Sequence, residues 1–106
     1  MLDKTAIINK NAKVHPSVKI GPYTIIGPNV EIGENCIIAG QVGFAGSSTL
    51  GNNVMIGGQA GISGHLKIGN NVQIGGGRGV IKNIPDNSKV MGYPAKDLKI
   101  FIKENK

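Results

Sequence analysis

The chain has 106 residues, a net charge of +6 and a single cysteine. No segment reaches the 18 or more consecutive apolar residues of a membrane-spanning helix, and the N-terminus lacks the charged and then apolar pattern of a secretion signal. We therefore expect no integral membrane segment and one soluble, cytoplasmic domain, of a size that would be marginal for an ordinary globular core.

Residues 2–80 follow a six-residue rhythm. An aliphatic or phenylalanine side chain occupies every sixth position from Leu2 to Val80, and the next residue is usually Gly, Ala or Ser from Gly21 to Gly75. A fixed period of this kind is the signature of a solenoid and excludes an ordinary globular core.

Each hexad assigns its residues to defined places. In residues 26–31 (IGPNVE), the first and fifth residues are predicted to point into a narrow core, and Gly, Pro and Asn between them to form a sharp corner that needs a positive φ or a preset turn angle. Three hexads would close one triangular coil of parallel strands stacked about 4.8 Å apart. The repeat therefore predicts an all-β parallel β-helix of about four to five coils.

The last residue of each hexad faces outward, so reading it once in every three hexads gives one column for each face. One column is polar and belongs in water: Lys13, Glu31, Thr49, Lys67 and Pro85. The second reads Ile7, Ile25, Gly43, Gly61 and Gly79, and the third reads Lys19, Ile37, Met55 and Gln73. Apolar or bare-backbone positions gather on two faces and predict a cyclic homotrimer, unless Ile25, Ile37 and Met55 are only scattered surface residues.

The repeat is predicted to end near Ile84, because Pro85 cannot donate to another ladder and an Asp-Asn turn pair follows. This divides the chain into a repeat domain, residues 1–85, and a C-terminal extension, residues 86–106. Leu98, Phe101 and Ile102 recur at helical spacing among lysines. They predict a short amphipathic helix that caps the last coil or packs on a neighbouring subunit, with membrane-surface binding as a weaker alternative.

The charge is concentrated near the C-terminus, where residues 76–106 hold seven basic and three acidic residues. Such a segment can steer an acidic macromolecule toward a site or be only a solvated tail. The two Tyr and two Phe form no stacking platform among the lysines, so we expect no nucleic-acid partner.

Metal binding is not expected either, because the chain offers one Cys and two well-separated His. Cys36 falls in an inward fifth position and is predicted to be a small buried residue. His15 lies at a corner and is predicted to be structural. Gly75, Gly76 and Gly77 lie in phase with the hexads, which favours a tight corner over a phosphate loop.

Residues 37–76 followed by residues 84–95 (IPDNSKVMGYPA) resemble the C-terminal part of the UDP-3-O-acylglucosamine N-acyltransferases of lipid A synthesis in Gram-negative bacteria. Residues 3–36 are similar to the first coils of that family and of UDP-N-acetylglucosamine O-acyltransferases. The resemblance implies a left-handed β-helix of hexapeptide repeats and a homotrimer with sites between subunits. It also implies no permanently bound cofactor and a 3-hydroxyacyl donor, acyl carrier protein with its phosphopantetheine thioester or acyl-CoA, that acylates a nucleotide sugar.

Acyl transfer to an amine needs a base that titrates near neutral pH and a backbone N–H directed at the developing oxyanion. By resemblance, His65 matches the family's second essential histidine and Gly46 the glycine whose amide is the oxyanion donor. Gly64 and Lys82 are the candidates for binding the acyl donor. Pro28, Gly46 and Gly64 are each three hexads apart, so they are predicted to stack at one corner beside His65.

The sequence departs from this family at the position of the general base, where Pro28 replaces a histidine in PNVEIG. None of the 106 residues resembles the uridine-binding domain or several middle coils of the family. Three functions remain open: an acyltransferase of the lipid A type, a smaller sugar O- or N-acetyltransferase, and a catalytically silent trimer. His65 itself is either a catalytic or ligand-positioning residue or a corner histidine bonded to its neighbours.

Overall fold

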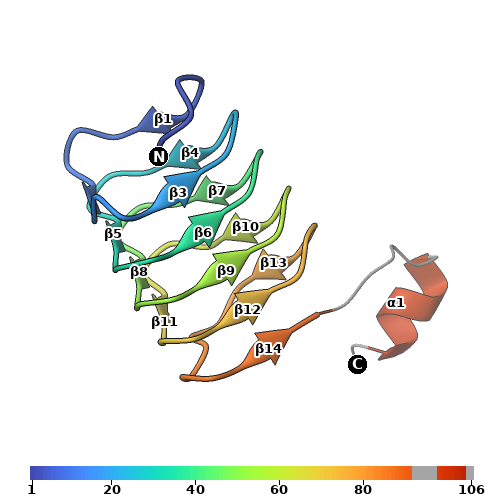
Figure 1. Cartoon of the computed structure of the whole chain (residues 1–106). Coiled ribbons are helices and arrows are strands. Elements are labelled where there is room, and N and C mark those ends of the chain that lie inside the picture. The colour runs from blue at the N-terminus through green and yellow to red at the C-terminus, as the bar shows by residue number, and fades with distance from the viewer. Residues whose placement is uncertain (92–97, 105–106) are drawn as a thin grey trace.

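The computed structural model describes residues 1–91 and 98–104, which form a parallel β-solenoid followed by one helix (Figure 1). Each strand has only two residues because a corner follows every few positions. The strands are β1 (Ile7–Ile8), β2 (Lys13–Val14), β3 (Lys19–Ile20), β4 (Ile25–Ile26), β5 (Glu31–Ile32), β6 (Ile37–Ile38), β7 (Gly43–Phe44), β8 (Thr49–Leu50), β9 (Met55–Ile56), β10 (Gly61–Ile62), β11 (Lys67–Ile68), β12 (Gln73–Ile74), β13 (Gly79–Val80) and β14 (Lys89–Val90). The helix is α1 (Leu98–Glu104).

Three parallel sheets form the sides of a triangular prism. Face A holds β3, β6, β9, β12 and β14, face B holds β1, β4, β7, β10 and β13, and face C holds β2, β5, β8 and β11. Ile26 pairs with Phe44 and Ile62 with Val80, so each residue lies opposite its equivalent three hexads along, as the repeat predicts. The chain winds with a left hand as it descends through about five turns (Figure 1). The predicted fold class is therefore confirmed.

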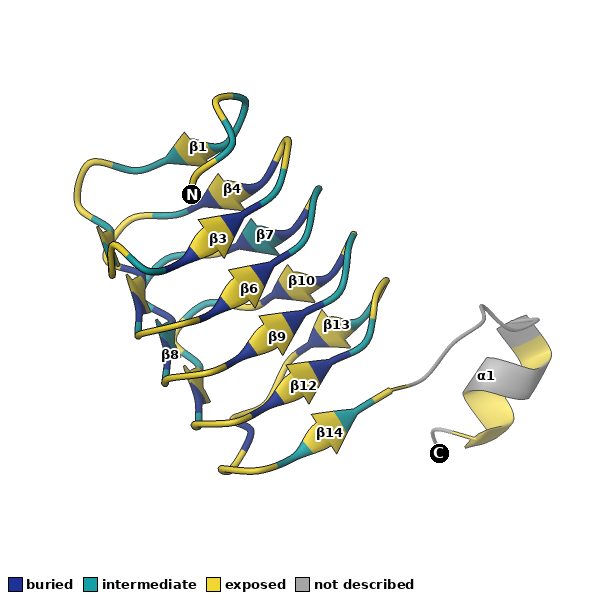
Figure 2. Cartoon of the chain, viewed as in Figure 1, coloured by how far each residue is buried: buried dark blue, intermediate teal, exposed yellow. Residues whose placement is uncertain are grey.

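The core consists of the first and fifth residues of the hexads. Ile26 is 1% exposed and Val30 is fully buried, whereas the outward residue of each strand is mostly open to solvent, so every strand has one buried or partly buried end and one more exposed end (Figure 2). Leu2 is 48% exposed because no coil covers the N-terminal end of the stack. Burial of aliphatic side chains in this column is the main force that holds the coils together.

The small polar residues in the fifth position, Thr24, Ser48 and Cys36, each reach a backbone carbonyl group. The hydroxyl groups of Thr24 and Ser48 donate to the carbonyl oxygens of Ala39 and Ser63, at 3.0 and 2.7 Å. Cys36 is fully buried and its thiol contacts a carbonyl oxygen in the same way, so the inward position predicted for it is confirmed. Burial raises the pKa of the Cys36 thiol, as expected for a structural cysteine.

Two hexad positions form each corner: the fourth adopts a positive φ, and the second lies close to the next coil. The fourth residue adopts the left-handed conformation throughout the middle of the stack, with φ values of 57–65° for ten non-glycine residues. The glycine in the second position serves a different purpose, because a Cβ added at Gly27 would lie 2.7 Å from the carbonyl oxygen of Phe44 in the next coil. Positive φ therefore falls on the non-glycine residues of the fourth position, five of which are Asn, and glycine in the second position permits the close approach of coils.

One corner carries a ladder of side-chain hydrogen bonds. The backbone N–H groups of Glu34, Asn52 and Asn70 each donate to the side-chain oxygen of the equivalent residue in the next coil, at 2.7–2.8 Å. We call this edge, where faces C and A meet, the asparagine corner, and its residues are Glu34, Asn52, Asn70 and Asp86. Each such bond contributes a net stabilisation on the order of 1 kcal/mol.

The expectation that the chain leaves the stack near Ile84 is wrong. Ile84 bridges Ile68, and β14 pairs with β12 with Gln73 opposite Lys89, so the last coil continues but falls short of three full hexads. Pro85 is tolerated because its missing N–H would point to a further coil and not to the one already formed. The regular spacing had predicted Pro85 in the outward column of face C. This prediction is wrong, because Ile84 and not Pro85 lies beside the strand residue Ile68.

The C-terminal helix is present at Leu98–Glu104, as its spacing predicted. The side chains of Leu98 and Phe101 and the segment 92–97 lie outside the described residues, so its capping role and the division of the chain at residue 85 stay predictions. No helix among residues 1–91 and 98–104 has the length and apolar character needed to cross a membrane.

The left-handed corner can be tested at Asn53, an exposed residue with φ of 60°. Asn53→Val should lower the free energy of unfolding by about 1–2 kcal/mol, because a β-branched residue is strained there, whereas Asn53→Gly should change it by less than about 0.5 kcal/mol. Urea unfolding followed by circular dichroism measures both. Equal losses in the two variants would contradict the corner assignment.

Candidate functional site

The structure brings three of the four predicted site residues, His65, Gly46 and Gly64, together at the edge where faces B and C meet. We call this edge the histidine corner and define it by Pro28, Gly46, Gly64 and His65. The His65 N–H donates to the carbonyl oxygen of Gly46 at 3.1 Å. A Cβ added at Gly46 would lie 3.1 Å from the carbonyl oxygen of Pro28, and one added at Gly64 would lie 3.2 Å from that of Gly46. The stacking inferred from the spacing of three hexads is thus confirmed.

His65 occupies the fourth position of its hexad, with a φ of 62°. Histidine is one of the few residue types enriched in this conformation, which turns its side chain out at the corner. The residue is exposed, and its ring makes no hydrogen bond to the described residues. The imidazole is therefore open to a ligand, and neighbouring side chains do not hold it in place.

The backbone amide of Gly46 differs from its counterparts at the asparagine corner. There, the Asn52 N–H is held by the side-chain oxygen of Asn70 in the next coil. At the histidine corner the equivalent residue is Gly64, which has no side chain to accept a bond, and no hydrogen bond of the described residues uses the Gly46 N–H. The corner therefore combines a free backbone donor with an adjacent imidazole.

Lys82 lies apart from the hydrogen-bonded part of this site. It is exposed and lines a cavity of about 350 Å³ at the C-terminal end of the stack, together with Arg78 and Met91. Its assignment to donor binding, like that of Gly64, stays a prediction. Among residues 1–91 and 98–104, no group of three or more His, Cys, Asp or Glu side chains is placed to hold a metal ion.

His15 forms a local turn, in line with its predicted structural role. The Ser17 N–H donates to His15 Nδ1 at 3.1 Å, and the Ser17 hydroxyl lies 2.7 Å from the same nitrogen. His15 Nε2 lies 3.9 Å from Glu34 Oε1, and both side chains are exposed to solvent. The Ser17 hydroxyl also accepts the Asn35 N–H at 2.8 Å, which ties this coil to the next.

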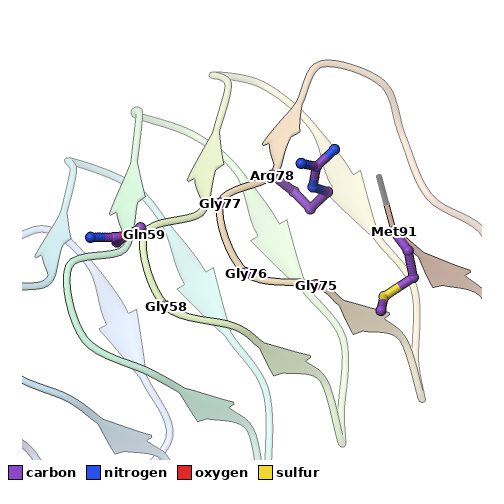
Figure 3. A pocket seen from close by; sticks show the side chains of 7 residues that line it. All are labelled: Gly58, Gln59, Gly75, Gly76, Gly77, Arg78 and Met91. Carbon is purple, nitrogen blue, oxygen red and sulfur yellow. The ribbon is translucent and has the colours of Figure 1, made fainter. Parts of the chain in front are cut away.

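A cavity of about 670 Å³ lies at a different corner, where faces A and B meet, and was not predicted from the sequence (Figure 3). We call this edge the glycine corner. The residues that line the cavity are Gly58, Gln59, Gly75, Gly76, Gly77, Arg78 and Met91. Gly77 has a φ of 68°, so the tight corner expected for these glycines is confirmed. The missed signal was Arg78, a charged residue in the fifth position, which elsewhere points inward.

Comparison with known proteins matches residues 11–46 to the bacterial transferase hexapeptide family (six repeats). A search of curated proteins finds no match. Serine acetyltransferase from Neisseria gonorrhoeae is 30% identical, with a TM-score of 0.65 over 81% of this chain and 40% of that one. Serine acetyltransferase 1 from Entamoeba histolytica is 23% identical, with a TM-score of 0.76 over 82% and 38% of the two chains.

The LpxA of Acinetobacter baumannii is 21% identical, with a TM-score of 0.51 over 98% of this chain and 76% of that one. At this level of identity the likeness shows the fold. The chain spans about two fifths of the length of the serine acetyltransferases it matches. The more specific resemblance to the UDP-3-O-acylglucosamine N-acyltransferases, inferred from the sequence, stays a prediction. The uninterrupted hexads and the left-handed parallel β-helix are thus similar to those of the bacterial transferase hexapeptide family, whose six-repeat pattern matches residues 11–46 of this chain.

Proposed function

We propose that this chain transfers an acyl group from a thioester to an amine at the histidine corner. The observation that carries the proposal is the adjacency of the Gly46 amide, which has no partner among the described residues, to His65, whose backbone is bonded to the same glycine. In the version that the sequence favours, acyl carrier protein delivers a 3-hydroxyacyl group to the amine of a UDP-glucosamine derivative in the cytoplasm, as in lipid A synthesis.

The reaction needs no covalent intermediate on the protein. The acceptor nitrogen attacks the thioester carbonyl carbon, and the negative charge that develops on its oxygen is stabilised by the Gly46 N–H. The His65 imidazole takes the proton from the attacking nitrogen as general base. The C–S bond then breaks, and the departing sulfur is protonated to a thiol, so the products are an amide and the free thiol of the donor.

Pro28 makes His65 decisive for this proposal. Proline has no side-chain group that can take a proton, and the other members of the histidine corner are glycines. His65 is therefore the imidazole on which the reaction depends. A single exposed base without a second group to orient it predicts a modest rate for an enzyme.

A second candidate is transfer of an acetyl group from a small thioester to a small acceptor. It is favoured by the 30% identity to the serine acetyltransferase of Neisseria gonorrhoeae. The same corner would perform it, because the amide and the imidazole contact the reacting carbonyl and nucleophile and not the remainder of the acyl chain. A third candidate, a silent trimer, is favoured by Pro28.

We also propose that the chain assembles as a homotrimer through faces A and B. Ile37 and Met55 on face A are 44% and 48% exposed, and form a ridge in the middle coils. On face B, a Cβ added at Gly43, Gly61 or Gly79 would meet nothing within 4 Å, so the strip of bare backbone is open to a neighbour. A ridge on one face and a shallow strip on another suit a closed ring of copies.

Turnover is tested by mass spectrometry of the acylated product, with 3-hydroxyacyl carrier protein and a UDP-glucosamine derivative, and separately with acetyl-CoA. His65→Ala should lower kcat by a factor of about 10²–10⁴, as expected for loss of a general base. His15→Ala is the matched control and should change it by less than about twofold, because that imidazole serves a local turn.

The outcomes separate the candidates. Product from the carrier-protein donor that is lost in His65→Ala supports the first, and product from acetyl-CoA alone supports the second. Product that forms only in Pro28→His supports the silent trimer as the natural state. Full activity in His65→Ala would eliminate the histidine corner as the site.

Assembly is measured by light scattering after size exclusion, where we expect about three times the chain mass of 11.0 kDa. Met55→Glu on face A should shift the protein toward monomer, because it places a charge in the apolar contact. Lys67→Glu on the polar face C should leave the mass unchanged. A stable monomer of the unaltered chain would refute the assembly.

A further inference from the structure

Ser47 lies one coil above His65, in the same position of its hexad. The two residues have nearly the same left-handed backbone, with φ values of 65° and 62°. The Ser47 N–H donates to the carbonyl oxygen of Pro28 at 2.9 Å, and the His65 N–H makes the equivalent bond to Gly46 at 3.1 Å. Because stacked residues of equal backbone geometry direct their side chains alike, the hydroxyl and the imidazole start from Cα atoms about 4.8 Å apart and are neighbours at this edge.

The Ser47 hydroxyl has no hydrogen-bond partner among residues 1–91 and 98–104. Ser47 is half-buried, yet its oxygen is open to solvent, since within those residues the buried side-chain nitrogen or oxygen that lacks a partner belongs to Arg78. The next residue, Ser48, is different, because it is fully buried and donates to the Ser63 carbonyl oxygen at 2.7 Å. The Ser48 hydroxyl therefore serves the fold, whereas the Ser47 hydroxyl is available to a ligand.

Two successive coils thus place three groups at one edge: the Gly46 N–H, the Ser47 hydroxyl and the His65 imidazole. In the proposed reaction the Gly46 N–H binds the carbonyl oxygen and His65 takes a proton from the nucleophile. Ser47 follows Gly46 in the chain and lies one coil above His65, so its hydroxyl adjoins the place of the attacking atom. Face C borders this edge and takes no part in the proposed trimer contact, which leaves the edge accessible from that side.

We propose that Ser47 makes the histidine corner selective for an amine acceptor over a hydroxyl acceptor, an inference that rests on the proposed function. A neutral amine has two N–H groups and one lone pair. When His65 binds one N–H and the Ser47 oxygen accepts the other, the lone pair is directed at the carbonyl carbon held by Gly46. A hydroxyl acceptor has a single O–H, which the imidazole takes, so it has no hydrogen left for Ser47. Ser47 keeps its own proton throughout.

Selectivity is measured with UDP-glucosamine and UDP-glucose, two acceptors that differ in an amino or a hydroxyl group at one carbon, and with the thioester donor that supports turnover. Ser47→Gly removes the hydroxyl and suits the left-handed backbone. It should lower kcat/KM for UDP-glucosamine by about five- to tenfold and change that for UDP-glucose by less than about twofold. Ser63→Gly is the matched control, since it removes an exposed hydroxyl from the same edge and should change either value by less than about twofold.

Circular dichroism verifies that each variant keeps its fold. Equal losses with both acceptors in Ser47→Gly would show that the hydroxyl acts on the thioester carbonyl, which both reactions share, and would overturn the selectivity. Unchanged kcat/KM for UDP-glucosamine in Ser47→Gly, or equal use of the two acceptors by the unaltered chain, would overturn it as well and leave the histidine corner as the site. No product from either acceptor would refute the proposed function, and this inference with it.

Discussion

The register of the coils depends on one backbone hydrogen bond that recurs at the corners. The fourth residue of a hexad, in the left-handed conformation, donates its N–H to the carbonyl oxygen of the third residue of the hexad directly above it. Asn53 bonds Glu34, His65 bonds Gly46, and Gly77 bonds Gly58 in this way, at 2.8–3.1 Å. The bond turns the chain and fixes the coil below in register, so the strands can be only two residues long and still pair.

The same backbone leaves the three corners free to differ chemically. At the asparagine corner, the side chains of Asn52, Asn70 and Asp86 each accept a hydrogen bond from the backbone N–H of the equivalent residue in the coil above. These N–H groups are therefore not open to a ligand. At the histidine and glycine corners, glycine takes that place and the amides have no partners among the described residues. The backbone amides that a ligand could reach therefore lie at the edges where side chains are missing, and at the histidine corner His65 is the side chain beside them.

The sequence predicted the parts of the structure that follow from the period. The six-residue period predicts which positions point inward and which residues pair three hexads apart. It also predicts the stacking of Pro28, Gly46 and Gly64. The period did not predict the last coil, because this coil is shortened after Val80 and the six-residue pattern ends there. The cavity at Arg78 was missed because glycines in phase predict a corner but not the space beside it. The use of His65 in a reaction depends on a ligand and on neighbouring chains, which a single sequence does not specify.

The stacking of the coils is tested most directly by the NMR coupling through hydrogen bonds between amide nitrogens and carbonyl carbons. The account predicts couplings that join the N of His65 to the C′ of Gly46 and the N of Asn53 to the C′ of Glu34, each across two successive coils. Couplings to residues four positions earlier would indicate helix, and reciprocal pairs between neighbouring strands would indicate antiparallel sheet. Either pattern over residues 20–80 would contradict the stacked triangular coils on which the proposed site depends.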